Sequence, residues 1–111
     1  MREILFYVSE RITHTGPLWR WTTPAAPAAW LFITIDGAAG EALSATALMR
    51  RMEGLSRGFG SLKVAATIGE TTFKTSVFPS KKTGWLLPIK AAVRKAERLI
   101  DGEAVALVLE V

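Results

Sequence analysis

Cysteine is absent from this chain of 111 residues, and histidine occurs only once, as His14. Without cysteine the chain forms no disulfide, no thiolate nucleophile, no iron–sulfur cluster and no cysteine-based zinc site. A single histidine also excludes histidine-rich metal sites and most general-base catalysis near neutral pH. We therefore expect neither a metal ion nor a cofactor.

Long apolar runs are also missing. The longest, residues 25–35, is interrupted by Pro27 and is too short for a membrane span. Residues 1–8 lack the apolar segment and the small-residue cleavage site of a signal peptide. We expect a cytoplasmic protein without membrane contact.

The composition is otherwise that of one folded domain. Hydrophobic residues make up 50% of the chain and charged residues 22%, which provides the apolar side chains that a packed core needs. The length is close to that of a typical single domain and too short for two.

Positive charge is concentrated in one part of the chain. Residues 1–55 carry five basic and five acidic side chains, residues 56–99 carry nine and two, and residues 100–111 carry three acidic ones. These blocks have charges of 0, +7 and −3, which sum to the net charge of +4. The basic block predicts a surface for an anionic small molecule, an acidic protein partner or a nucleic acid, although an ordinary solvated face has the same composition.

Proline and hydrophobic spacing divide the first half of the chain. A helix over 40–53 is predicted because four apolar residues recur at helical spacing: Ala45, Leu48, Met49 and Met52. The elements expected before it are an N-terminal arm (1–17), a strand (18–21), a proline-containing loop (22–29) and a strand (30–35).

The second half begins with a hairpin over 61–68 and 71–78, since alternate residues of its first strand are apolar. A short strand over 85–87 follows, then a helix that begins at Pro88 and stops before Gly102, and a strand over 104–111. The residues expected to be buried are Leu62, Val64, Ala66 and Ile68 in the hairpin, Ile89, Ala92, Val93, Ala96 and Ile100 in the helix, and Val105, Leu107, Leu109 and Val111 in the last strand.

Two folds fit this order of elements. Residues 30–111 alone follow the strand, helix, strand, strand, helix, strand order of an α+β ferredoxin-like fold. The strands at 18–21 and 85–87 favour instead a mainly β fold, a single-chain six-stranded pseudobarrel capped by two α-helices. A weak repeat of strand, helix and strand, in which Trp30 and Trp85 occupy equivalent positions, also favours the pseudobarrel. We predict one pseudobarrel domain over 18–111.

Several segments resemble the domain-of-unknown-function 1905 family. They are residues 18–21 (LWRW), 59–69 (FGSLKVAATIG), 75–79 (TSVFP) and 87–97 (LPIKAAVRKAE). The family's Gly-Asp-x-Val ending appears here with Glu103 in place of the aspartate. The resemblance implies a helix-capped β-pseudobarrel related in architecture to the swapped-hairpin barrels of AbrB-like transcription factors, and it implies no established activity.

The likeness of residues 87–105 to the half-barrel of AbrB-like proteins gives an alternative function, DNA binding. Such factors bind DNA as dimers, and a complete single-chain barrel would argue against that mode. The cations that would contact phosphates are Arg57, Lys63, Lys90, Arg94, Lys95 and Arg98.

The preferred function is recognition of an anionic ligand or acidic partner. Tryptophans are most often core residues, but a cleft, if present, would have Trp85 and Phe78 as its apolar wall. The loop that contains Lys81 and Lys82 would lie beside it, and Lys90 and Arg94 would lie near its mouth.

No group of residues has the spacing of a catalytic site. Asp36 and Glu41 flank the start of the first helix, where an interaction with the helix dipole explains them. The serines have only the distant His14 as a possible base. We therefore expect a binding domain rather than an enzyme, and a monomer and a homodimer both fit the sequence.

Overall fold

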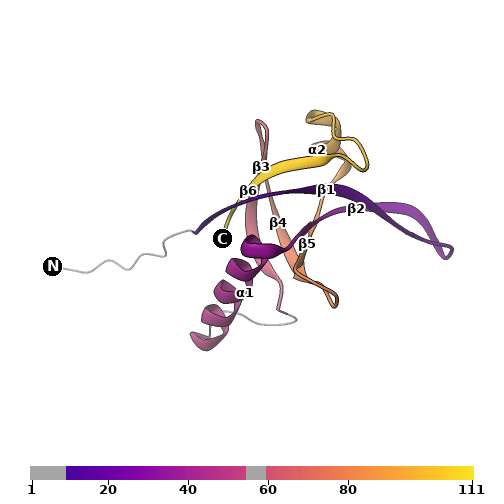
Figure 1. Cartoon of the computed structure of the whole chain (residues 1–111). Helices are drawn as coiled ribbons and strands as arrows, with labels where there is room; N and C mark the ends of the chain where they lie inside the picture. The colour runs from indigo at the N-terminus through magenta and orange to yellow at the C-terminus, as the bar shows by residue number, and fades with distance from the viewer. Residues whose placement is uncertain (1–9, 55–59) are drawn as a thin grey trace.

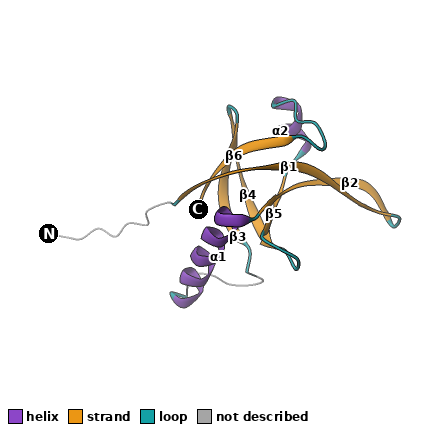
Figure 2. Ribbon diagram, in the orientation of Figure 1, coloured by secondary structure: helices purple, strands orange, loops and turns teal. Residues whose placement is uncertain are grey.

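The computed structural model describes residues 10–54 and 60–111, and it is a closed antiparallel barrel with the strand order β1-β2-β5-β4-β3-β6. Figures 1 and 2 show the barrel with one helix near each end. The mainly β prediction is confirmed, and the ferredoxin-like alternative is wrong because β1 and β5 complete the barrel wall. The elements are β1 (Arg11–Thr23), β2 (Ala26–Ile35), α1 (Gly37–Met52), β3 (Leu62–Ile68), β4 (Thr71–Pro79), β5 (Trp85–Pro88), α2 (Ala91–Ala96) and β6 (Ala104–Glu110).

The strand order contains an internal two-fold repeat. Exchanging β1 with β4, β2 with β5 and β3 with β6 gives every strand the same pair of neighbours. The repeated unit is therefore two strands, a helix and a strand. This topology agrees with the repeat in the sequence, although the equivalent tryptophans differ in burial: Trp30 is exposed and Trp85 is buried.

β1 is longer than predicted and belongs to both sides of the barrel. Residues 11–17 pair with β6, and residues 18–23 pair with β2. The predicted arm over 1–17 is therefore wrong for residues 11–17, while residues 1–9 lie outside the described part of the chain.

The predicted loop over 22–29 is also wrong, because only Pro24 and Ala25 separate β1 from β2. Figure 1 shows the turn of this hairpin reaching past the rest of the barrel. The part of β2 before Phe32 pairs with β1 only, because β5 pairs with β2 from Phe32 to Ile35. Proline lacks an N–H donor and is tolerated at such a sheet edge, which explains how Pro27 lies in a strand.

The core follows the predicted alternation in the hairpin and the last strand. Successive side chains of a strand point to opposite faces, so every second residue faces the barrel interior. The predicted residues are buried, with Val111 half-buried at the end of the chain: Leu62, Val64, Ala66 and Ile68 in β3, and Val105, Leu107 and Leu109 in β6.

α1 packs through a different face from the one predicted. Its buried residues are Ala39, Gly40, Leu43 and Ala47. The predicted stripe is exposed instead, with Leu48 at 52% and Met52 at 77% of full exposure; Met49 and Ala45 are exposed as well. The buried residues in the first turn of α1 are small because this turn lies close against the end of β2. A Cβ on Gly40 would lie 2.7 Å from the Ile35 carbonyl oxygen.

α2 is shorter than predicted. Pro88 ends β5 instead of opening the helix, which begins at Ala91 and ends at Ala96. The helix stops before Gly102 because Arg98 adopts a left-handed conformation (φ 54°) and the Leu99 N–H donates to the Arg94 carbonyl.

Burial in this region follows the shorter helix. Ile89 and Val93 are buried as predicted, whereas Ala92, Ala96 and Ile100 are exposed and Leu99 packs against the core in their place. In the described part of the chain, neither helix has the length and apolar character that crossing a membrane requires.

Candidate functional site

The predicted cleft wall of Trp85 and Phe78 is wrong. Trp85 is a core residue, only 5% exposed, and its indole N–H donates to the Ser44 hydroxyl on α1 at 3.0 Å. Phe78 lies opposite Leu86, one register step from Trp85, so alternation places its ring on the outer face. The two rings are on opposite sides of the barrel wall and cannot line one cleft.

The loop that contains Lys81 and Lys82 lies at the far end of β5 from Lys90. The Ser80 N–H donates to the Gly84 carbonyl, and the Lys82 N–H donates to the Ser80 hydroxyl, which shapes this turn before β5 begins. The strand separates the loop from α2 by about 10 Å of extended chain. Lys81 and Lys82 therefore do not join the other predicted cations.

A different groove does contain Lys90 and Arg94. Its volume is about 400 Å³, and it lies where β2, the end of β5 and the start of α2 meet. The Ile89 N–H donates to the Leu31 carbonyl at 2.9 Å, which holds the β5–α2 connection against β2. The lining is mostly apolar, and its residues are Trp30, Leu31, Pro88, Ile89, Lys90, Ala91 and Arg94.

The charged residues that line this groove are both positive. Lys90 and Arg94 are four residues apart, so they lie on one side of α2, and no acidic residue is among the lining residues. Two of the carboxylates that follow Arg94 in the chain bond elsewhere: Glu97 accepts from the Thr71 hydroxyl, and Asp101 forms an ion pair with Arg20 at 2.9 Å. The lining therefore combines apolar side chains with two positive charges.

The wider set of cations predicted for DNA contact does not gather on one face. Lys63 lies near the start of β3, at the barrel end that α1 enters, whereas Lys90, Arg94 and Lys95 belong to α2 and its N-cap at the other end. Figure 1 shows the two helices near opposite ends of the barrel. Arg98 follows the end of α2, and Arg57 lies outside the described residues.

Sequence reasoning missed Trp30 as a site residue. The strand predicted over 30–35 is the second part of β2, but nothing in the local pattern of β2 indicates which tryptophan faces the core. Three of the four tryptophans lie on the β1–β2 hairpin, and Trp30 is 55% exposed. The signal that could have found it was the preceding proline-rich segment, which marks a sheet edge.

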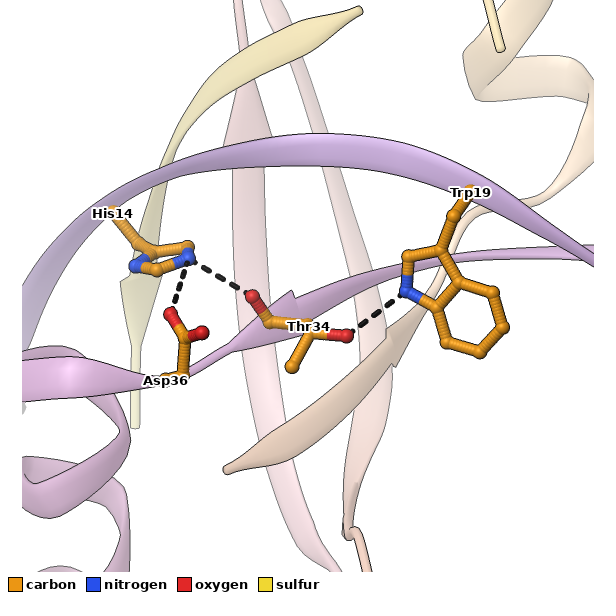
Figure 3. Close-up of polar contacts among 4 residues, drawn as sticks. All are labelled: His14, Trp19, Thr34 and Asp36. Atoms are coloured by element: carbon orange, nitrogen blue, oxygen red, sulfur yellow. Dashed lines mark hydrogen bonds and ion pairs between the residues drawn. The ribbon is translucent and has the colours of Figure 1, made fainter. Parts of the chain in front are cut away.

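His14 takes part in a polar cluster separate from the groove, shown in Figure 3. Its Nε2 lies 2.9 Å from the Thr34 carbonyl oxygen and 3.8 Å from an Asp36 carboxylate oxygen, and the Trp19 indole N–H donates to the Thr34 hydroxyl at 2.9 Å. A carbonyl only accepts hydrogen bonds, so His14 donates through Nε2. The Thr34 carbonyl lies one residue past the last β1–β2 pair, Leu18 and Ile33, so these side chains continue the strand contact where the backbone pairing ends.

This cluster has a structural explanation and does not resemble a metal centre. Within residues 10–54 and 60–111, no three histidine, aspartate or glutamate side chains are close enough to hold a metal ion.

Comparison with known proteins agrees with the fold. The family model described as "Domain of unknown function (DUF1905)" matches residues 14–109, which is nearly the whole chain. A search of curated proteins gives no match. The start of the match at residue 14 includes part of β1 that the sequence had assigned to an arm. The chain belongs to the DUF1905 family of domains of unknown function.

Proposed function

We propose that this domain is a binding module without catalytic activity, which takes an anionic ligand in the groove between Trp30 and Arg94. One observation carries the proposal: an apolar groove is bordered by two cations that, among the described residues, form no ion pair. Binding sites for small ligands combine apolar walls with a few polar groups in this way. The ligand is an anion with an apolar or planar part, either a small molecule or an acidic segment of a partner protein.

The two cations have different roles in this proposal. The Arg94 guanidinium provides two parallel N–H donors for a carboxylate or phosphate, whereas the Lys90 ammonium acts as a compact point charge. Arg94 is also partly ordered before binding, because its Nη1 donates weakly to the Ile89 carbonyl at 3.4 Å. The Trp30 ring supplies the apolar wall.

Removing both positive charges is expected to abolish stabilisation by an anion. Pyrophosphate at ten times its dissociation constant should stabilise the folded protein by about 1.4 kcal/mol, which raises the melting temperature by roughly 5 °C for a domain of this size. The double variant Lys90→Gln/Arg94→Gln should lose this rise. The measurement is thermal unfolding followed by circular dichroism, with sodium chloride at matched ionic strength as the reference.

The matched control removes two exposed cations elsewhere, Lys63→Gln/Lys81→Gln. It should keep the full response to pyrophosphate. A wild-type protein that does not respond, or a Lys90→Gln/Arg94→Gln variant that responds normally, would contradict the proposed site.

DNA binding remains the alternative prediction. It predicts that phosphates contact Lys63 on β3 together with Lys90, Arg94, Lys95 and Arg98, which lie in α2 or next to it. Binding of a random DNA duplex that weakens steeply between about 50 and 200 mM salt, and that Lys63→Gln reduces, would favour this alternative.

A further inference from the structure

The outer face of the β1–β2 hairpin carries four aromatic rings, which we call the aromatic row: Trp19, Trp21, Trp30 and Phe32. Trp21 faces Trp30 across the two strands, and Trp19 faces Phe32. Trp21 is 45% exposed and Trp30 55%, while the other two rings are half-buried. Contiguous exposed apolar surface often marks a binding site.

The rings of the aromatic row are ordered against one another. The centroids of Trp19 and Phe32 are 5.3 Å apart, with the planes tilted by 35°. Trp30 and Phe32 lie 6.4 Å apart, and their planes differ by only 13°. The Trp19 indole is further held by its hydrogen bond to Thr34. These contacts order Trp19, Phe32 and Trp30 before any ligand binds.

The aromatic row continues directly into the positively charged groove. Phe32 pairs with Pro88, and both Trp30 and Pro88 line the groove beside Lys90 and Arg94. Aromatic faces and cations therefore form one surface across β2, the end of β5 and the start of α2.

We propose that this surface binds single-stranded nucleic acid, an inference that rests on the anion-binding function proposed above. Bases would stack on the exposed rings of Trp21 and Trp30, and the adjacent phosphates would contact Lys90 and Arg94. Aromatic platforms next to basic side chains bind single strands with little sequence preference, because every base has a π face. The charge complementarity between the groove and a phosphate backbone favours this ligand over an apolar peptide.

A double helix does not fit this surface in the same way. Its bases are stacked on each other, so their faces are not available to side chains on an outer sheet face. The surface should therefore distinguish a single strand from a duplex of the same length. This preference separates the inference from the DNA-binding alternative.

The test measures binding of a fluorescein-labelled oligothymidylate of twelve nucleotides by anisotropy. Two phosphate contacts predict that the logarithm of the association constant falls against the logarithm of salt concentration with a slope of about −1.4. Lys90→Gln/Arg94→Gln should bring this slope close to zero. Trp21→Leu and Trp30→Leu should each weaken binding about tenfold and leave the slope unchanged.

Leucine keeps apolar bulk but cannot stack, so these variants separate base stacking from general hydrophobic contact. Phe78→Leu, at an exposed ring on β4 outside the aromatic row, is the matched control and should bind as the wild type does. Trp21→Phe and Trp30→Phe retain a ring and should bind within about threefold of the wild type. If a leucine variant proves less folded by near-ultraviolet circular dichroism, the affinity for the oligothymidylate relative to a duplex and the salt slope of Lys90→Gln/Arg94→Gln still decide the result.

Three results would overturn the inference: no binding of the oligothymidylate, equal affinity for a twelve-base-pair duplex, or leucine variants that stay folded and bind as the wild type does. The last result would indicate a simple anion contact. Pyrophosphate stabilisation that depends on Lys90 and Arg94, without oligonucleotide binding, would support the proposed function and reject only the nucleic-acid inference. Loss of both responses would reject both.

Discussion

Replacing Gly84 with alanine is expected to destabilise the barrel by about 3 kcal/mol or more. Gly84 immediately precedes β5 and has φ +67°, a left-handed conformation that costs a residue with a side chain about 1–2 kcal/mol. A Cβ at this position would also lie 2.3 Å from the Ile35 carbonyl oxygen and 3.0 Å from the Asp36 Cα. Because both contacts are with backbone atoms, the β2–α1 junction or β5 must move. Urea unfolding of the variant measures the loss.

Gly37→Ala separates the two contributions to this effect. Gly37 also has a positive φ of 59°, but a Cβ there would meet no atom within 4 Å. This variant should therefore lose only the conformational contribution, about 1–2 kcal/mol. If Gly84→Ala and Gly37→Ala lowered the free energy of unfolding equally, the β4–β5 loop could not approach the end of β2 as closely as described.

Leu43→Ala should cost about 3 kcal/mol, within the usual range for a leucine removed from a packed core. Leu43 is fully buried where α1 meets the barrel, and alanine would leave a cavity in the helix–barrel contact. The free energy of unfolding by urea, together with an unchanged far-ultraviolet spectrum, measures this effect in a protein that is still folded.

Leu48→Ala is the control on the same helix. Leu48 lies in the stripe that periodicity predicted to be buried, yet it is exposed in the structure. Its replacement should change stability by at most about 0.5 kcal/mol. If Leu48→Ala proved as costly as Leu43→Ala, the orientation of α1 would be wrong.

The elements that sequence reasoning predicted best are those whose pattern has one interpretation. In β3 and β6, strict alternation determines which residues face the interior, and the turn of Gly69 and Glu70 sets the hairpin register. Each of these strands has a neighbour on both sides, so pattern and environment agree along its length.

The predictions that failed depend on partners that are distant in the sequence. α1 carries two stripes at helical spacing, and the helix packs through the smaller residues because Gly40 must approach the Ile35 carbonyl. The pattern of residues 40–53 alone does not indicate this contact with Ile35. Likewise, a loop was predicted around Pro27 because proline disrupts a strand that has neighbours on both sides. The first part of β2 pairs with β1 alone, so Pro27 is tolerated there.

The candidate site was predicted only in part, again because one of its residues is distant in the sequence from the others. Lys90 and Arg94 were selected from helical spacing and charge, and both do line a groove. Their apolar partner was expected to be Trp85 because it is close in sequence. Strand pairing places Trp85 in the core and brings Trp30, sixty residues before Lys90, to the groove instead.

A proton–nitrogen NMR titration with pyrophosphate tests whether an anion binds between Trp30 and Arg94. Each of the four tryptophans gives one indole N–H signal. The signals of the Trp30 indole and of the amides of Lys90, Ala91 and Arg94 are expected to shift in a saturable way. The indole of Trp85, buried and bonded to Ser44, should not move. Shifts confined to Lys63 and its neighbours on β3 and β4, or no shifts at all, would contradict the account.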